Sequence, residues 1–183
     1  MVLAGDAFQL PPTVKDPAAL KAGLGVSLLE KAIDRERNVH LLDTQYRMHA
    51  DIMAFPNATF YGGALQAAPD VAGRTLGELL PLTFIDTAGR GWDEERSAPE
   101  ADTTGRSHAS IHNPEEAAFT VDRVRELLQQ HPAASIGVIA PYRAQVALLE
   151  DLLHSEVVAA KGRLTIQTVD GFQGQERDIM VIG

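Results

Sequence analysis

The chain has 183 residues, a formal net charge of -9 at neutral pH, 45% hydrophobic residues and no cysteine. This composition is typical of a globular protein with room for one domain, or for one domain and a small part of another. The missing cysteines exclude disulfides and thiolate metal sites and fit a reducing compartment, so we expect the cytoplasm. No apolar run approaches the roughly 18 residues of a membrane span, and the first residues lack a secretory pattern, so we expect no membrane partner. The acidic charge argues against a globally basic nucleic-acid surface but leaves room for a local one.

The first half of the chain predicts short strands and two helices. Three brief apolar runs predict strands: Val2–Ala4, Val39–Leu42 and Leu82–Ile85. The stretch from Ser27 to Arg35 predicts a helix with Ser27 as its N-cap. The stretch from Ala50 to Phe60 predicts another helix, which Pro56 should end or kink.

The segment at about 89–110 is rich in Gly, Asp, Glu, Ser and Thr, which predicts a long irregular insertion. It carries a cluster of acidic residues: Asp93, Glu94, Glu95, Glu100 and Asp102. A charge run of this kind is typical of a solvated loop, so we assign it no metal.

The second half predicts alternating helices and strands. Asn113 is a helix cap, Pro114 suits the first helical position, and Glu116 predicts a capping box for a helix that runs to about Gln130. A second amphipathic helix is predicted over 143–154. Strands are predicted over 136–140, 164–169 and 178–182. This alternation predicts an α/β fold, with a mostly parallel sheet covered by helices on both faces.

Ligands of such sheets gather at the carboxyl ends of the strands, and four motifs fall there. The first runs from Gly5 to Pro12. Its Gln9, on a loop stiffened by two prolines, could orient a water or sense a terminal phosphate. The alternative is a capped turn with an exposed glutamine.

The second motif is Gln45–His49. The guanidinium of Arg47 suits phosphate oxygens, and Tyr46 offers a flat face for a base. The alternative is that Arg47 pairs with Asp43 or Asp51 and that Tyr46 belongs to the core. His49 is interpreted as a helix-start residue.

The third motif combines Pro141, Tyr142 and Arg143, which could hold a stacked nucleotide and its phosphate. The alternative is a plain helix N-terminus. The fourth motif runs from Thr168 to Asp178. Two glycines expose its backbone, Thr168 can donate to a phosphate, and Glu176 can accept from a ribose hydroxyl. The alternative is a hairpin-like connection between two strands.

Taken in order, the four motifs resemble those of the superfamily 1 helicases. The similar branch is the 5′-to-3′ one that contains the nonsense-mediated decay RNA helicase, the immunoglobulin-mu-binding helicase and the Okazaki-fragment helicase-nuclease. The resemblance extends from Gly5 to Ile182. It implies a RecA-like fold of the P-loop NTPase type, in which ATP with Mg²⁺ lies between two lobes and a single strand of DNA or RNA crosses them.

The resemblance also implies roles for particular residues. Gln9 would be the γ-phosphate sensor and Arg47 the arginine finger. The nucleotide would be bound by four residues: Asp6, Tyr46, Gly174 and Glu176. The nucleic acid would be contacted by five: Thr168, Val169, Pro141, Tyr142 and Arg143. The phosphate-cradling Gly-x-x-x-x-Gly-Lys-Thr loop and the Asp-Glu pair after a strand are absent from these residues.

We therefore expect residues 1–14 to be the tail of a first lobe and residues 15–183 to be a second lobe, truncated before its last arginine motif. The chain alone should bind ATP weakly and hydrolyse essentially none, while the first lobe of the same parent completes the site. Two alternatives remain open. One is a remnant that acts as a nucleic-acid or protein interaction module, and the other is an ATPase that remodels its substrate without unwinding.

Overall fold

The computed structural model describes residues 2–11, 13–35, 38–97, 100–101 and 107–183. Pro12 of the first motif and Asp102 of the acidic cluster lie outside these residues. The chain forms two compact units, Met1–Ile85 (unit 1) and Asp86–Gly183 (unit 2), which are described separately.

Unit 1 begins with short helices. Helix α1 (Pro17–Ala19) leads into a π-helical turn, η1 (Leu20–Leu24), and helix α2 covers Leu28–Ile33. The predicted cap of α2 is confirmed, because Ser27 Oγ accepts from the backbone of Glu30 and the Glu30 carboxylate accepts from the backbone of Ser27. The helix ends two residues earlier than predicted.

The remainder of unit 1 is a small parallel ladder with a helix against it. Strand β1 (Thr44–Gln45) pairs with β2 (Gln66–Ala67), and α3 (Ala50–Phe60) lies between them in the chain, followed by α4 (Pro69–Ala72). The prediction of α3 is confirmed. Pro56 lies inside the helix and does not end it. Its ring removes one backbone donor, but the turn that follows keeps its hydrogen bond from Tyr61 N to Asn57 O (3.1 Å).

The three strands predicted in unit 1 do not form as such: Val2–Ala4, Val39–Leu42 and Leu82–Ile85 are extended segments without ladder bonds. A strand is stable only when a neighbour takes up its backbone hydrogen bonds. These runs remain exposed, with Val2 at 94%, Leu42 at 89% and Phe84 at 88% of full exposure. The prediction was wrong because an apolar pattern indicates that a segment tends to be buried, but it does not identify the strand with which the segment would pair.

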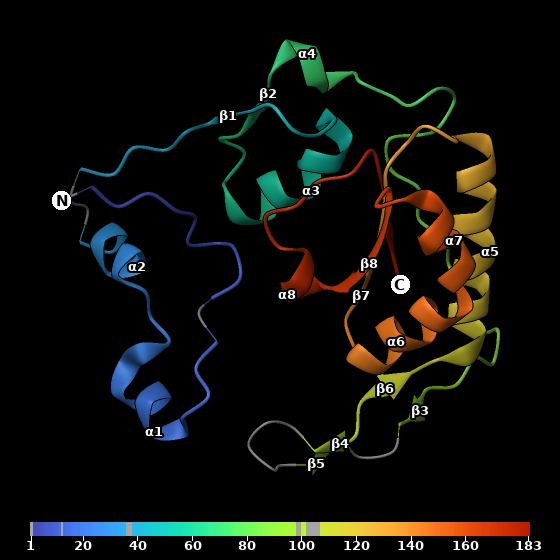
Figure 1. Ribbon diagram of the computed structural model, residues 1–183. Helices are drawn as coiled ribbons and strands as arrows, with labels where there is room; N and C mark the ends of the chain where they lie inside the picture. The colour runs from blue at the N-terminus through green and yellow to red at the C-terminus, as the bar shows by residue number, and fades with distance from the viewer. Residues whose placement is uncertain (1, 12, 36–37, 98–99, 102–106) are drawn as a thin grey trace. The chain divides into compact units, whose positions relative to one another are not determined.

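Unit 2 is built on a parallel three-stranded sheet in the order β8-β7-β9 (Figure 1). Strand β7 (Ile136–Ala140) is central, and β8 (Leu164–Thr168) and β9 (Ile179–Ile182) lie on either side of it. All three strands were predicted within a residue of their ends. The central strand is continuous and apolar, as a strand buried on both faces requires.

Helices cover both faces of this sheet. Figure 1 shows α5 (Pro114–Gln130), α6 (Arg143–Leu152) and α7 (His154–Ala160) on one side of β7 and β8, and α8 (Val169–Phe172) on the other. On the α8 side, a side chain at Gly137 would lie 2.6 Å from the ring of Phe172. Side chains alternate along a strand, so Ile136 and Val138 point to the opposite face, where both are fully buried. The predicted α/β architecture is therefore confirmed, with α7 and α8 as helices that the sequence pattern missed.

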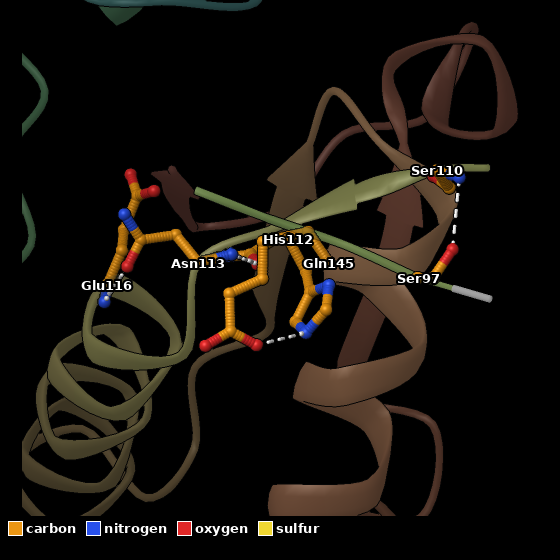
Figure 2. Close-up of polar contacts among 7 residues, drawn as sticks. Ser97, Ser110, His112, Asn113, Glu116 and Gln145 are labelled. Atoms are coloured by element: carbon orange, nitrogen blue, oxygen red, sulfur yellow. Dashed lines mark hydrogen bonds and ion pairs between the residues drawn. The ribbon is translucent and has the colours of Figure 1, made fainter. Parts of the chain in front are cut away.

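The start of α5 departs from the prediction in one respect (Figure 2). Asn113 caps the helix by accepting from the backbone of Glu116 (3.0 Å). The reciprocal half of the expected capping box is replaced, because the backbone N–H of Asn113 donates to Oε1 of Gln145 on α6 (2.8 Å). The two helices are thus joined at their N-terminal ends.

The acidic insertion is less irregular than predicted. Strand β3 (Glu95–Arg96) pairs antiparallel with β6 (Ile111–His112), and β4 (Glu100–Ala101) pairs with β5 (Ser107–His108). Ahead of these strands, the Arg90 guanidinium lies over the rings of Trp92 (5.2 Å) and Phe119 of α5 (5.9 Å). These contacts hold the start of the insertion against a helix. Within the described residues, no helix is both long and apolar enough to cross a membrane.

Candidate functional site

The loop of the first motif is organised by one carboxylate. Asp6 accepts hydrogen bonds from the backbone of Phe8 (3.0 Å), from Nε2 of Gln9 (3.0 Å) and from the hydroxyl of Tyr61 (2.5 Å). The ring of Phe8 packs edge-on against that of Tyr61 at 5.2 Å. This local geometry is the capped turn with an exposed glutamine that the alternative proposed. The turn also holds the Gln9 side chain, because the Asp6 carboxylate accepts its hydrogen bond.

The same contacts shift two pKa values. Burial acts to raise the pKa of Asp6, but the bonds from Tyr61, Phe8 and Gln9 outweigh it and lower that pKa below its ordinary value. Burial, the hydrogen bond to Asp6 and its negative charge together raise the pKa of Tyr61 to about 12. Near neutral pH, Asp6 is therefore the ionised acceptor and Tyr61 the donor.

The second motif is a tight turn held by the side chain of Gln45. Its Oε1 accepts from the backbones of Arg47 (2.8 Å) and Met48 (2.9 Å), and its Nε2 donates to the carbonyl of Met48 (2.7 Å). Arg74 donates to the carbonyl of Arg47 (2.9 Å). The backbone at Arg47 is fixed from both sides.

This turn presents two predicted site residues on the surface of unit 1. Tyr46 is 71% exposed, which excludes the alternative that it is a core residue. The side chain of Arg47 is also exposed. His49 caps α3, with Nδ1 accepting from the backbone of Asp51 (3.0 Å), so its predicted role at the helix start is confirmed.

In unit 2, the register of the sheet brings the third and fourth motifs together. Ala140 and Thr168 are paired at the carboxyl ends of β7 and β8. Pro141, Tyr142 and Arg143 follow the first of these residues, and Val169 follows the second. Tyr142 is the N-cap of α6, as the helix-start alternative proposed, and its ring is 43% exposed.

Thr168 caps the short helix α8, since its Oγ1 accepts from the backbone of Gly171 (3.3 Å). A hairpin between β8 and β9 is excluded, because both strands run parallel to β7 and lie on opposite sides of it. The connection must therefore carry the chain back along the whole length of the sheet.

This return path separates the two halves of the fourth motif. Ile179, the first residue of β9, pairs with Ile136 at the amino end of β7. Gly174 and Glu176 lie on the segment that leads from α8 to this end of the sheet. The backbone at Gly174 has φ +82°, a conformation that favours glycine. Glu176 is exposed.

The return path is held by hydrogen bonds from residues to which no role was assigned in the sequence analysis. Nε2 of Gln175 donates to Oε1 of Gln167 (3.0 Å) and to the carbonyl of Gly171 (3.1 Å). Arg177 donates to Oγ1 of Thr165 (2.9 Å), and its guanidinium lies 5.4 Å from the centre of the Phe172 ring. The run of polar side chains after Gly174 was the available signal, but hydrogen-bond partners depend on the path of the chain.

Among the described residues, no group of three or more His, Cys, Asp or Glu side chains could hold a metal ion. Among the described residues, Tyr46 and Arg47 of unit 1 present an exposed aromatic ring and an exposed guanidinium, and Glu176 of unit 2 presents an exposed carboxylate. They offer stacking, phosphate and hydroxyl contacts. A phosphate cradle and metal ligands are not supplied by these three.

Comparisons with known proteins show similarity along the whole chain. Residues 24–183 match the family model described as "AAA domain". The chain is 36% identical to DNA polymerase alpha-associated DNA helicase A of Saccharomyces cerevisiae, over 100% of this chain and 29% of that protein. It is 36% identical to the DNA-binding protein SMUBP-2 of Mesocricetus auratus, over 99% of this chain and 18% of that protein.

A third relative is the helicase sen1 of Schizosaccharomyces pombe, 35% identical over 98% of this chain and 11% of that protein. The chain spans less than a third of the length of each of these relatives. The matches to these three relatives extend over both units. The chain therefore belongs to the superfamily 1 helicases that carry this AAA domain.

Proposed function

We propose that this chain is part of a longer ATP-dependent helicase, in which residues 1–14 end the first RecA-like lobe and residues 15–183 form most of the second. The observation that carries the proposal is the match of the entire chain, at 36% identity, to a protein named as a DNA helicase. The parallel sheet of unit 2 supports it, because its carboxyl edge carries the third motif and the start of the fourth.

In this proposal, Gln9 senses the terminal phosphate, and Asp6 holds the Gln9 side chain in a defined orientation through the 3.0 Å bond to Nε2. A glutamine so placed orients a water or a phosphate oxygen without itself gaining or losing a proton. Arg47, on the turn fixed by Gln45, supplies the arginine finger. Its fixed backbone reduces the freedom lost when the guanidinium engages phosphate oxygens.

Three further residues bind the remainder of the nucleotide. The exposed ring of Tyr46 stacks on the base, the Glu176 carboxylate accepts from a ribose hydroxyl, and Gly174 allows close approach of the backbone. When bound, ATP with Mg²⁺ supplies the phosphoryl group whose transfer to water releases free energy. The phosphate cradle and the metal ligands come from the first lobe, which is the partner that completes this site.

The single strand contacts the carboxyl edge of the sheet in unit 2. Thr168 and Val169 touch the sugar-phosphate backbone, and Pro141, Tyr142 and Arg143 lie next to them through the Ala140–Thr168 pair. Backbone contacts and an aromatic face give affinity with little sequence preference. The overall acidic charge requires these contacts to be local.

The test uses the full-length protein, with ATP hydrolysis measured with and without single-stranded DNA or RNA, together with displacement of a labelled strand. We expect hydrolysis to be stimulated by the single strand and a duplex with an overhang to be unwound. Stimulated hydrolysis without displacement would instead identify an ATPase that remodels its substrate. Absence of any nucleic-acid-dependent hydrolysis would overturn the proposal.

A further inference from the structure

Unit 2 holds a pocket of about 220 Å³ at the place where α5 and α6 begin. Its walls include Ile111, Pro141, Tyr142 and Gly183, and its polar lining consists of His112, Asn113, Glu116 and Gln145, with Glu94 alongside. Figure 2 shows His112, Asn113 and Gln145 meeting at the first turn of α5. No role assigned to the four motifs uses the side chains of His112, Glu116 or Gln145.

Two buried polar atoms at this pocket have no hydrogen-bond partner among the described residues: Nε2 of Gln145 and Nδ1 of His112. Gln145 is only 4% exposed, and its Oε1 is occupied by the backbone of Asn113. A buried amide that is left half satisfied costs folding free energy unless something takes up its donor. Gln145 therefore offers one unpaired N–H donor at the pocket.

The acceptors of the pocket come from the neighbouring side chains. Nε2 of His112 lies 3.5 Å from a carboxylate oxygen of Glu95, and its Nδ1 has no hydrogen-bond partner among the described residues. The backbone N–H of Asn113 donates to Gln145, so the capping box does not occupy the carboxylate of Glu116, a residue that lines the pocket.

These groups are rigidly supported. The strand that carries His112 is tied to its partner by the backbone bond from Ser97 to Ser110 (2.8 Å) and by the bond from the backbone of Ser110 to Ser97 Oγ (3.0 Å). Oγ of Ser110 in turn accepts from the backbone of Ala144 at the start of α6 (3.1 Å). A pocket held in this way can distinguish ligands by their hydrogen-bond pattern.

The chemistry of the lining selects among ligands. Glu94 and Glu116 repel a phosphate, so the ligand is neutral or cationic where it meets them. The pocket borders Pro141 and Tyr142, where the proposed function places the single strand. Among the bases, guanine presents two adjacent donors for a carboxylate and one acceptor for an amide on its Watson–Crick edge. That pattern complements Glu116 and Gln145.

We propose that this pocket binds one unstacked base of the single strand and prefers guanine, with Glu116 as acceptor and Gln145 as donor. The inference rests on the proposed function, since it requires a bound single strand. It adds a base-specific contact to an interface that otherwise touches only the backbone and base faces.

The experiment measures binding of the full-length protein to labelled oligothymidine and oligouridine in which one guanine, or one adenine as the comparison, is moved along the strand. Glu116→Gln removes the negative charge of the carboxylate and keeps a side chain of the same length at this position of α5. Gln145→Glu retains an acceptor for Asn113 and replaces the unpaired donor with a second oxygen. Glu115→Gln is the matched control, because Glu115 is an exposed neighbour in the same helical turn that does not line the pocket.

We expect one guanine position to tighten binding about 10-fold relative to adenine, in the range of a good two-bond base contact. Both pocket variants should lose that preference and keep the affinity for plain oligothymidine or oligouridine, and Glu115→Gln should change neither. Equal affinity for guanine and adenine at all positions, or a preference that survives in both pocket variants, would overturn the inference and leave the proposed function intact. Absence of any single-strand binding would overturn both.

Discussion

The hydroxyl of Tyr61 donates a 2.5 Å hydrogen bond to the carboxylate of Asp6, which lies 55 residues earlier in the chain. Asp6 also holds the side chain of Gln9, so one carboxylate connects the proposed phosphate sensor to the end of α3. In the proposed division into lobes, Asp6 belongs to the first lobe and Tyr61 to the second. The bond then couples the sensor loop of one lobe to the other.

Replacing Tyr61 with Phe should remove this bond and keep the ring contact with Phe8. We expect a loss of about 1 kcal/mol in the free energy of unfolding, since the bond is to a charged group but only partly buried. Urea unfolding of the chain measures the loss. Tyr142→Phe, at an exposed ring in unit 2, is the control. A loss equal to that of the control would show that the bond contributes nothing.

The same pair predicts how stability depends on pH. The pKa of Tyr61 is raised to about 12, so its contribution is complete below the ordinary tyrosine value near 10 and is lost as pH rises from there through 12. The pKa of Asp6 is lowered, so its contribution is present above the ordinary value near 3.9 and is lost as pH falls through the lowered pKa. An ultraviolet titration of the phenols should show a step near 12 that is missing in Tyr61→Phe. Persistence of that step in the variant would contradict the assignment.

Replacing Gln145 with Ala should destabilise unit 2 by about 1–3 kcal/mol, because the buried backbone N–H of Asn113 loses its acceptor. Gln145→Glu keeps an acceptor for this N–H but buries a carboxylate, so it should also destabilise unit 2. Urea unfolding of the two variants beside Gln129→Ala, at an exposed position on α5, measures the difference. Equal losses for Gln145→Ala and Gln129→Ala would contradict the importance of this joint between α5 and α6.

Gly137→Ala should overpack the sheet. Its new methyl group would lie 2.6 Å from the Phe172 ring and 2.9 Å from the sulfur of Met180. We expect a loss of about 1–3 kcal/mol and weaker single-strand binding, since α8 must move and Thr168 caps α8. Gly73→Ala, where no atom lies within 4 Å of the added carbon, is the control for thermal unfolding and binding. Unchanged stability in Gly137→Ala would show that α8 does not pack here as described.

The sequence predicted unit 2 better than unit 1 for a physical reason. Strands β8 and β9 both pair with the apolar strand β7, so the pattern and the structure agree. The runs Val2–Ala4, Val39–Leu42 and Leu82–Ile85 carry a similar pattern without a partner strand among the described residues, and no ladder forms. Local composition reports the tendency to pair and does not identify the pairing partner.

In the candidate site, too, some features could be predicted from the sequence and others could not. Motif residues such as Arg47 and Thr168 could be named from their sequence context, and the resemblance implied their roles. The residues that position them could not be named, because Gln45, Tyr61 and Gln175 act through hydrogen bonds that depend on how the loops fold. The path of the chain after α8, which returns to the amino end of β7 at Ile179, could not be predicted because the motif is one continuous stretch of sequence.

The most direct test of the central claim is the rate of nucleic-acid-stimulated ATP hydrolysis by the full-length protein carrying Arg47→Ala. Arg35→Ala, at an exposed arginine after α2, serves as the matched control. If Arg47 is the arginine finger, the rate should fall by about 10³- to 10⁵-fold in the first variant and remain unchanged in the second. A rate for Arg47→Ala within about threefold of the unsubstituted protein would contradict the role proposed for this lobe.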